Sequence, residues 1–364
     1  MPDRTKIKKM EVNPVFMERC LQLARKGEGY THPNPMVGAV IVHHNRIIGE
    51  GYHRQFGKAH AEVNAIMAVK EEALLSDSTL YVSLEPCSHH GKTPPCTELI
   101  IARNIPRVVV AVKDPNPAVS GRGIEMLRAQ GIEVAEGILE NESRELNRMF
   151  FVNQQYNRPY VILKWAQSKD RFIDHARTSL QEKRPAVISN RLTHTLVHKI
   201  RTQVQGILVG TRTALLDNPQ LTARKWCGQH PVRIVIDREN RIPSSSALFD
   251  GTTPTIVFTT SVRRDLPNEE VKQILIDFHG DTNRQILQCL YREGIYSLLV
   301  EGGASLLSSF IRKNMWDEAY VETSEKMLYN GTKAPEIEGE EINTKIYSGS
   351  IQFHLKCQIT RNFL

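Results

Sequence analysis

The chain has 364 residues, 40% of them hydrophobic and 24% charged, which is the composition of a globular protein with room for two domains. No apolar run approaches the ~18 residues of a membrane span, and the polar N-terminus lacks a secretion signal, so we expect a cytoplasmic protein without a membrane partner. The net charge of +7 is spread along the chain, which argues against a nucleic-acid partner. The six scattered cysteines indicate a reducing compartment.

The first half of the chain alternates helical and strand patterns. Asn13 is a good N-cap, Pro14 suits the first helical position, and Gly27 ends the apolar spacing that follows. Beyond this helix we expect a hairpin over 37–43 and 46–52, a helix over 60–75, strands over 79–84 and 107–113, a helix over 123–130 and a strand over 132–135. Strands that alternate with helices predict a sheet between helical layers.

A domain boundary is expected within residues 141–158, where a polar helix (141–153) leads into a polar linker. We therefore predict one domain at 1–152 and a second at 153–364. The second half alternates again, with strands expected over 160–165, 206–210, 232–237, 255–259 and 295–301, helices over 191–202 and 283–293, and a further helix after Gly302-Gly303. The halves do not resemble each other, which predicts a fusion of two different domains.

Metal-ligand residue types gather where predicted strands and helices meet in the first half. His60 begins a predicted helix, Cys87 follows a buried strand, and Cys96 closes the loop PCSHHGKTPPC. One imidazole and two thiolates leave the fourth position of a zinc ion open, which is typical of catalytic zinc. Glu62 supplies the carboxylate that an activated water needs as proton acceptor and donor. The set resembles the zinc-deaminase signature H-x-E…P-C-x-x-C, with a longer loop between the cysteines.

These motifs and their flanks resemble the deaminase half of the bifunctional deaminase/reductases of riboflavin biosynthesis, over about residues 14–150. The likeness rests on HAEVNA and EPCSHHGKTPPC, with PNPMVGAVIV, GEGYH and KDPNPAVSGRGIEMLRAQGIEV around them. It implies one zinc ion per chain, held by His60, Cys87 and Cys96, with Glu62 as the catalytic proton shuttle. It implies substrate contacts from Asn34, His53, His89 and Lys92, with Lys92 near the phosphate.

The second half carries two motifs, GILVGTRTALLDNPQLTAR (206–224) and VEGGASLLSSF (300–310). The Gly-Gly pair opens a predicted helix whose N–H groups can hold a phosphate, but the G-x-G-x-x-G fingerprint of a Rossmann domain is absent. The motifs resemble the dihydrofolate-reductase-like domain of the same family. The resemblance implies an NADPH site lined by Ala166, Thr213, Asp217, Gly303, Ala304, Ser305, Leu306, Leu307, Ser308 and Ser309. It implies contacts to a phosphorylated substrate from Arg201, Leu221, Arg224 and Glu301.

The segment 168–187 departs from the family pattern. The sequence reads SKDRF after the first strand of this half and RPAV before Ile188-Ser189, where the family has a serine-containing stretch that ends in tryptophan. A substrate-contacting serine has no clear counterpart, so a deaminase with a degenerate second half stays an alternative. The retained DNPQLTAR and VEGG segments favour a working reductase.

The sequence thus predicts an α/β protein: a three-layer α/β/α cytidine-deaminase-like domain fused to a dihydrofolate-reductase-like α/β domain. The implied function is deamination of a phosphoribosylated diaminopyrimidine, followed by NADPH reduction of the ribosyl group to the ribityl side chain. The family also implies small phosphorylated pyrimidine substrates and a homodimer or tetramer. An RNA-editing deaminase would call for a concentrated basic surface and a short zinc loop, and neither is present. A zinc scaffold without chemistry would not need Glu62.

Overall fold

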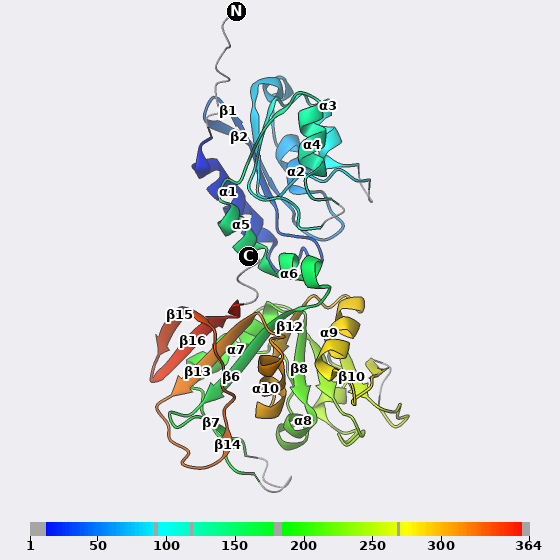
Figure 1. Ribbon diagram of the computed structural model, residues 1–364, viewed down its shortest axis with the longest axis vertical. Coiled ribbons are helices and arrows are strands. Elements are labelled where there is room, and N and C mark those ends of the chain that lie inside the picture. The colour runs from blue at the N-terminus through cyan, green and yellow to red at the C-terminus, as the bar shows by residue number, and fades with distance from the viewer. Residues whose placement is uncertain (1–11, 91–93, 117–118, 178–183, 268–269, 359–364) are drawn as a thin grey trace, which may run out of the picture. The chain divides into compact units, whose positions relative to one another are not determined.

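The computed structural model describes residues 12–90, 94–116, 119–177, 184–267 and 270–358 (Figure 1). It divides into two compact units, Met1–Gln155 and Tyr156–Phe363, each with its own sheet. Within the described part of the chain, no helix has the length and apolar character needed to cross a membrane.

The first unit is built on a five-stranded sheet in the order β2-β1-β3-β4-β5. β1 runs antiparallel to β2 and β3, whereas β3, β4 and β5 are parallel. The strands are β1 (Gly38–His43), β2 (Arg46–Tyr52), β3 (Thr79–Val82), β4 (Arg107–Val110) and β5 (Glu133–Glu136). The helices are α1 (Pro14–Ala24), α2 (Ala61–Met67), α3 (Cys96–Ala102), α4 (Arg122–Ala129), α5 (Glu140–Leu146) and α6 (Arg148–Tyr156).

Helices cover both faces of this sheet, so the expected three-layer arrangement is confirmed. Ala39 and Ile41 of β1 pack with α2, α3 and α4 on one face. Val40 and Val42 point to the opposite face and pack with α1. On β2, a Cβ at Gly51 would overlap the backbone of α2, so the glycine lets that helix lie directly against the strand. This close approach fixes the start of α2, where His60 and Glu62 lie.

Two predicted helices of this unit have different limits in the structure. The helix expected over 60–75 is wrong beyond Met67, because the N–H groups of Ala68 and Val69 bond three residues back and end α2; a 3₁₀ turn, η2 (Glu72–Asp77), follows. The helix expected over 141–153 is broken at Asn147 into α5 and α6. The Asn147 amide pairs with the N–H and C=O of Met36 at 2.8 and 2.9 Å.

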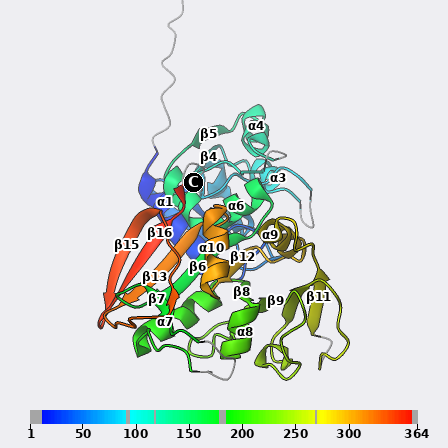
Figure 2. The ribbon, with the colours of Figure 1, turned by 60° about the horizontal axis from the view of Figure 1, so that its bottom comes forward.

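The second unit is built on a nine-stranded sheet in the order β11-β10-β9-β8-β12-β6-β13-β16-β15. The strands from β11 to β13 are parallel, and β16 and β15 add an antiparallel hairpin at one edge, opposite β11 (Figure 2). The strands are β6 (Tyr160–Gln167), β8 (Gly206–Gly210), β9 (Val232–Ile236), β10 (Thr255–Thr259), β11 (Val271–Leu275), β12 (Ser297–Val300), β13 (Glu318–Ser324), β15 (Glu340–Tyr347) and β16 (Ser350–Lys356). Short strands β7 (Phe172–Asp174) and β14 (Thr332–Lys333) pair with each other.

Helices flank this second sheet as well. They are α7 (Arg191–Thr202), α8 (Thr211–Asp217), α9 (Thr282–Arg292) and α10 (Ala304–Arg312). The main core joins α9 and α10 to β6, β8 and β12 and includes the fully buried side chains of Leu290, Phe310 and Trp316. Because β8, β12 and β6 are parallel neighbours, the segments that follow them meet at one edge of the sheet. α8 and α10 both begin at that edge.

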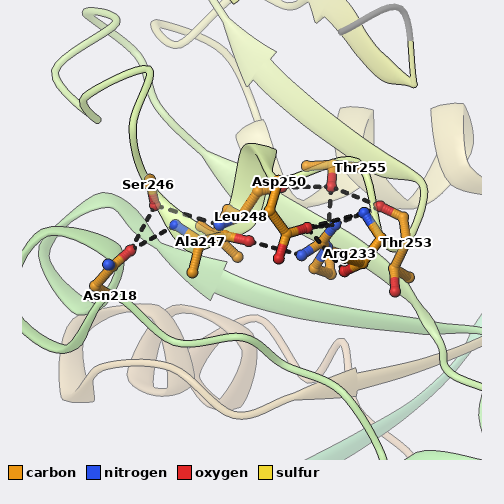
Figure 3. A network of polar contacts seen from close by, with 9 residues as sticks. Asn218, Arg233, Ser246, Ala247, Leu248, Asp250, Thr253 and Thr255 are labelled. Atoms are coloured by element: carbon orange, nitrogen blue, oxygen red, sulfur yellow. Dashed lines mark hydrogen bonds and ion pairs between the residues drawn. The ribbon is translucent and has the colours of Figure 1, made fainter. Parts of the chain in front are cut away.

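A buried arginine ties the loop after β9 to the sheet (Figure 3). Arg233 on β9 is fully buried and donates to the carbonyls of Ala247 and Thr253 and to the Asp250 carboxylate, at 2.7, 2.5 and 2.9 Å. Asn218, at the end of α8, accepts from the Ala247 N–H in the same loop. The loop is therefore held from both β9 and α8.

Replacing Arg233 with methionine should lower the free energy of unfolding of the second unit by about 3 kcal/mol, because two buried carbonyls lose their donor. The chain's 3 tryptophans all lie in this unit, so urea titration followed by tryptophan fluorescence reports its unfolding. Arg292→Met, on an exposed helix end, is the control and should change stability by less than about 0.5 kcal/mol. Equal effects of the two changes would contradict the structural role of Arg233.

Candidate active sites

The three predicted zinc ligands of the first unit lie together. His60 precedes α2, Cys87 follows the end of β3, and Cys96 is the first residue of α3. The His60 Nδ1 atom lies 3.5 Å from Cys87 Sγ and 3.4 Å from Cys96 Sγ, and all three ligand atoms lie within 4.8 Å of one another. Tetrahedral zinc with ordinary Zn–N and Zn–S bonds places N and S about 3.6 Å apart. The donor set therefore fits one zinc ion.

The electrostatics of this cluster favour a cation. A hydrogen bond from the Cys96 thiol and the nearby His60 ring lower the pKa of Cys87 to about 4. Cys96 in turn donates its backbone N–H to the Cys87 sulfur at 3.3 Å. The cluster thus holds a thiolate in a mostly buried position, and a bound divalent cation would balance its charge.

Glu62 lies in the first turn of α2, two residues beyond His60, and is 3% exposed. Burial, with a smaller contribution from the Cys87 thiolate, raises the pKa of its carboxyl group to about 7. A cation on the neighbouring ligands would lower this pKa. In the metal-free site this carboxyl group therefore gains and loses a proton near neutral pH.

A cavity of about 410 Å³ opens in front of these residues. Its lining includes Asn34, His53 and His89, three of the predicted substrate contacts. Lys92, the fourth, lies outside the described residues. Phe150 of α6 also lines this cavity.

The hydrogen bonds of His53 define its tautomer. Its Nδ1 lies 3.1 Å from the carbonyl of Ala59, which only accepts, so Nδ1 carries the proton. Burial lowers the pKa of His53, so the ring is neutral and its Nε2 accepts from the Asn34 amide at 3.2 Å. This arrangement leaves the Asn34 carbonyl oxygen to accept a hydrogen bond from a ligand.

Sequence reasoning missed Glu85, Asp114 and Asn116, which also line the cavity. Glu85 is buried, and its carboxylate accepts from four backbone N–H groups, those of Asp114, Gly121, Gly123 and Ile124, at 2.9 to 3.3 Å. It thereby joins the loop that carries Cys87 to the loop before α4. The signal available was a carboxylate next to proline at the end of a buried strand.

The second unit holds a larger cavity, of about 940 Å³, at the edge where β6, β8 and β12 end. Its lining contains most of the residues predicted for the cofactor: Ala166, Thr213, Asp217, Gly303, Ala304, Ser305, Leu306 and Leu307. Ser308 and Ser309 are not among the lining residues. Ser309 points toward α9 instead, where it bonds Asn283 at 3.0 Å.

Gly303 shapes the floor of this cavity. Its φ of +71° is a conformation that other residues rarely adopt, and a Cβ there would lie 3.2 Å from Thr213 Oγ1. The glycine thus lets the starts of α10 and α8 approach each other. Gly303 to Leu307, at the start of α10, line the same cavity, and the N–H groups of a helix's first turn suit an anionic group such as a phosphate.

Of the four residues predicted to bind the reductase substrate, one lines the cavity and three do not. Glu301 lines the cavity, where it forms a bidentate ion pair with Arg201 at 3.1 and 2.6 Å. Arg201, Leu221 and Arg224 are not among the lining residues. Leu221 is buried, and exposed Arg224 donates to Thr222 at 3.3 Å. The charge of Arg201 is therefore already balanced within the protein.

Lys164 is a cavity residue that sequence reasoning missed. It interrupts the apolar strand β6 and is 8% exposed, with its side chain on the cavity wall. Burial lowers the pKa of its amine, while the carboxylates of Glu301 and Glu322 oppose that shift. A lysine within an otherwise buried strand was the signal that could have revealed it.

Family models match both units. Residues 10–112 match the cytidine and deoxycytidylate deaminase zinc-binding region, and residues 159–357 match the RibD C-terminal domain. The riboflavin biosynthesis protein RibD of Aquifex aeolicus is 42% identical over 88% of this chain and 89% of its own length. The Escherichia coli RibD protein is 36% identical over 86% of this chain and 88% of its own length.

Solved structures agree with these matches. A Thermotoga maritima diaminohydroxyphosphoribosylaminopyrimidine deaminase/5-amino-6-(5-phosphoribosylamino)uracil reductase superposes with a TM-score of 0.84 at 37% identity, covering 94% of this chain and 98% of that one. RibD of Acinetobacter baumannii gives 0.83 at 31%, with the same coverage. A deaminase unit with a His-Cys-Cys centre and a reductase unit with a nucleotide-sized cavity define a bifunctional deaminase/reductase. The chain belongs to the RibD family of riboflavin biosynthesis.

Replacing Glu85 with glutamine should weaken the loop before α4, because an amide cannot accept from four N–H groups and brings two donors of its own. We expect local opening of residues 119–130 to become easier by about 2 kcal/mol, or roughly 30-fold faster hydrogen exchange. Exchange measured by mass spectrometry checks this. Glu72→Gln removes an exposed carboxylate that pairs with Arg103, outside this segment, and serves as the control. Unchanged protection in Glu85→Gln would refute the role.

Proposed function

We propose that this protein carries out two consecutive steps of riboflavin synthesis. The first unit deaminates the phosphoribosylated diaminopyrimidine, and the second reduces the ribosyl group of the product to a ribityl chain with NADPH. The observation that carries the proposal is the pairing of a His-Cys-Cys centre beside a buried Glu62 with a separate cavity of about 940 Å³. Family models cover both units, so a chain with a degenerate second half is not favoured.

In the first unit, His60, Cys87 and Cys96 would hold the zinc ion. Zinc bound there would supply a Lewis acid that brings the pKa of a water molecule close to neutrality. Glu62, two residues from the His60 ligand, accepts the proton of that water and returns it to the departing amine nitrogen. His53 and Asn34 orient the pyrimidine ring on the cavity wall. His89 contacts the substrate, and Lys92 binds its phosphate.

In the second unit, NADPH would supply a hydride for C1′ of the ring-opened ribosyl group. The first turn of α10, from Gly303 to Leu307, holds a phosphate of the cofactor together with Thr213, and Ala166 and Asp217 complete its site. Lys164 provides a proton-bearing group inside the same cavity. Glu301 contacts the substrate and is itself fixed by Arg201. Leu221 and Arg224 would reach the substrate only through a local rearrangement.

We further propose that the deaminase spans residues 1–152 and the reductase 153–364, which the compact units Met1–Gln155 and Tyr156–Phe363 support. The protein acts as a cytoplasmic homodimer or tetramer. The six cysteines all lie in the described part of the chain and are free thiols there, which is compatible with a reducing compartment.

Glu62→Gln should keep zinc, because the ligands are untouched. It should lower the rate of deamination by about 10²- to 10⁴-fold, the usual contribution of a general base. Ammonia release from the phosphoribosylated diaminopyrimidine and metal content of the purified protein measure the two effects. Oxidation of NADPH with the deaminated substrate is the internal control and should be unchanged. Substantial turnover by a zinc-loaded variant would exclude this role.

Gly303→Ala should raise the KM for NADPH by about 10-fold or more, because the added Cβ crowds Thr213 and strains a left-handed backbone by about 1–2 kcal/mol. Steady-state reduction of the deaminated substrate measures it, and deamination should be unaffected. Gly294→Ala is a matched control: its φ is +78°, but it has open space around it and lies outside the cavity. If both variants bind NADPH alike, the assignment of Gly303 fails.

A further inference from the structure

A second group of metal-ligand side chains lies away from the active sites, at the tip of the β1–β2 hairpin. His43 ends β1, His44 lies in the turn, and Asp77 ends η2. The Nε2 atoms of His43 and His44 lie 3.7 and 3.5 Å from the same oxygen of Asp77, Oδ2. All three ligand atoms lie within 4.8 Å of one another. Nothing in the proposed deamination or reduction uses these residues.

We propose that His43, His44 and Asp77 form a second metal site, which binds a divalent transition-metal ion such as zinc or nickel. Two imidazoles and one carboxylate suit these ions, whereas magnesium and calcium prefer oxygen ligands alone. Tetrahedral zinc places bound N and O atoms about 3.3 Å apart, close to the 3.7 and 3.5 Å that separate the two imidazole nitrogens from Oδ2 of Asp77. Solvent would complete the coordination.

The backbone holds the two histidines in place. His44 and Asn45 have φ values of +46° and +60°, as in the tight turns that join paired strands. This turn brings the two imidazole rings to 4.0 Å between centroids. The His43 side chain is only 19% exposed, so it is fixed, whereas His44 is 73% exposed and can adjust to an ion.

Arg107 orients the carboxylate. Its guanidinium donates to the carbonyl of Asp77 at 3.1 Å and to Thr79 at 3.0 Å, and lies 3.5 Å from Oδ1 of Asp77. Oδ1 therefore faces the arginine, while Oδ2 faces the histidines. Such outer contacts commonly fix the direction of a metal-binding carboxylate. The arginine also lowers the net negative charge of the site, which favours ions that imidazole binds well over hard cations.

The site is separate from the deaminase centre. Val37, which precedes β1, lines the deaminase cavity, whereas His43 is at the other end of that strand. Six residues of strand place the two ends about 17 Å apart. An ion at the tip would join the hairpin to the segment after α2 without touching the substrate.

Metal binding to the full-length, zinc-loaded protein tests the proposal. Equilibrium dialysis at neutral pH against micromolar zinc or nickel should give two ions per chain for the wild type. His44→Asn, which suits the left-handed turn, and Asp77→Asn, which keeps the shape of the side chain, should each bind one. His279→Asn removes an exposed histidine of the second unit and should still give two. Loss of a ligand should weaken the second binding step at least about 10-fold.

Two further measurements separate this site from the deaminase centre. Nickel should raise the melting temperature of the wild type and of His279→Asn but not of the two site variants. Cobalt in this site should lack the sulfur-to-metal absorption that two thiolates produce. The proposal is wrong if the wild type binds one ion, if the variants bind two, or if binding appears only at millimolar metal, where any surface histidine binds. Failure here would leave the deaminase and reductase assignments intact.

Discussion

Both cavities lie at strand ends because helices cover the central strands of each sheet on both faces. β3, β8 and β12 run between helical layers as almost wholly buried strands, so polar groups on them are confined to their ends. Glu85 and Cys87 lie three and five residues beyond the end of β3, and Glu301 directly follows β12. Polar chemistry therefore collects at one edge of each sheet. Charged side chains also lie within other strands of the second sheet. Lys164 of β6 opens into a cavity, and Arg233 of β9 is held by two carbonyls and the Asp250 carboxylate.

Buried charges in this protein fall into two groups. Glu85, Arg233 and the Arg201–Glu301 pair have several strong hydrogen bonds each, and they hold loops and helices in position. Glu62 and Lys164 are equally buried, but burial shifts their pKa values toward neutrality. A buried charge with a full set of partners holds the structure in place, whereas a desolvated group beside a cavity can exchange its proton. The first group of residues thus supports the structure, and the second is suited to proton transfer.

Much of the fold follows from sequence because the strands and helices are locally consistent. The Asn13-Pro14 helix start, the hairpin at His44-Asn45 and the helix Arg191–Thr202 all match the expected limits. The short helices α3 and α8, the edge strand β11 and the C-terminal strands were not predicted. Seven-residue helices show too little periodicity, and β15 is exposed along almost its whole length, so it lacks an apolar face to recognise.

The residues of the candidate sites also divide into those that could be predicted from the sequence and those that could not. His60, Cys87 and Cys96 could be predicted as ligands because metal chemistry demands particular residue types, and the structure places their ligand atoms within 4.8 Å of one another. Glu62 could be predicted as the carboxylate because it lies two residues from His60. Glu85 and Lys164 could not be predicted as site residues. The N–H groups that bond Glu85 lie 29 to 39 residues away in the sequence, and the environment of Lys164 includes a carboxylate from a neighbouring strand. The guanidinium of Arg201 seemed free for phosphate in the sequence, but only the tertiary structure reveals its pairing with Glu301.

The anchoring of Cys87 and Cys96 has a consequence for how such enzymes diversify. Cys96 lies at the start of α3, and the N–H groups of Cys96 and Thr97 donate to the sulfur and the carbonyl of Cys87, so these contacts hold the two cysteines together directly and do not pass through the eight residues between them. Insertions in that stretch can alter which molecules fit the cavity while the metal geometry is preserved. Evolution can thus explore new substrates by changing loop length alone, without rebuilding the reactive centre.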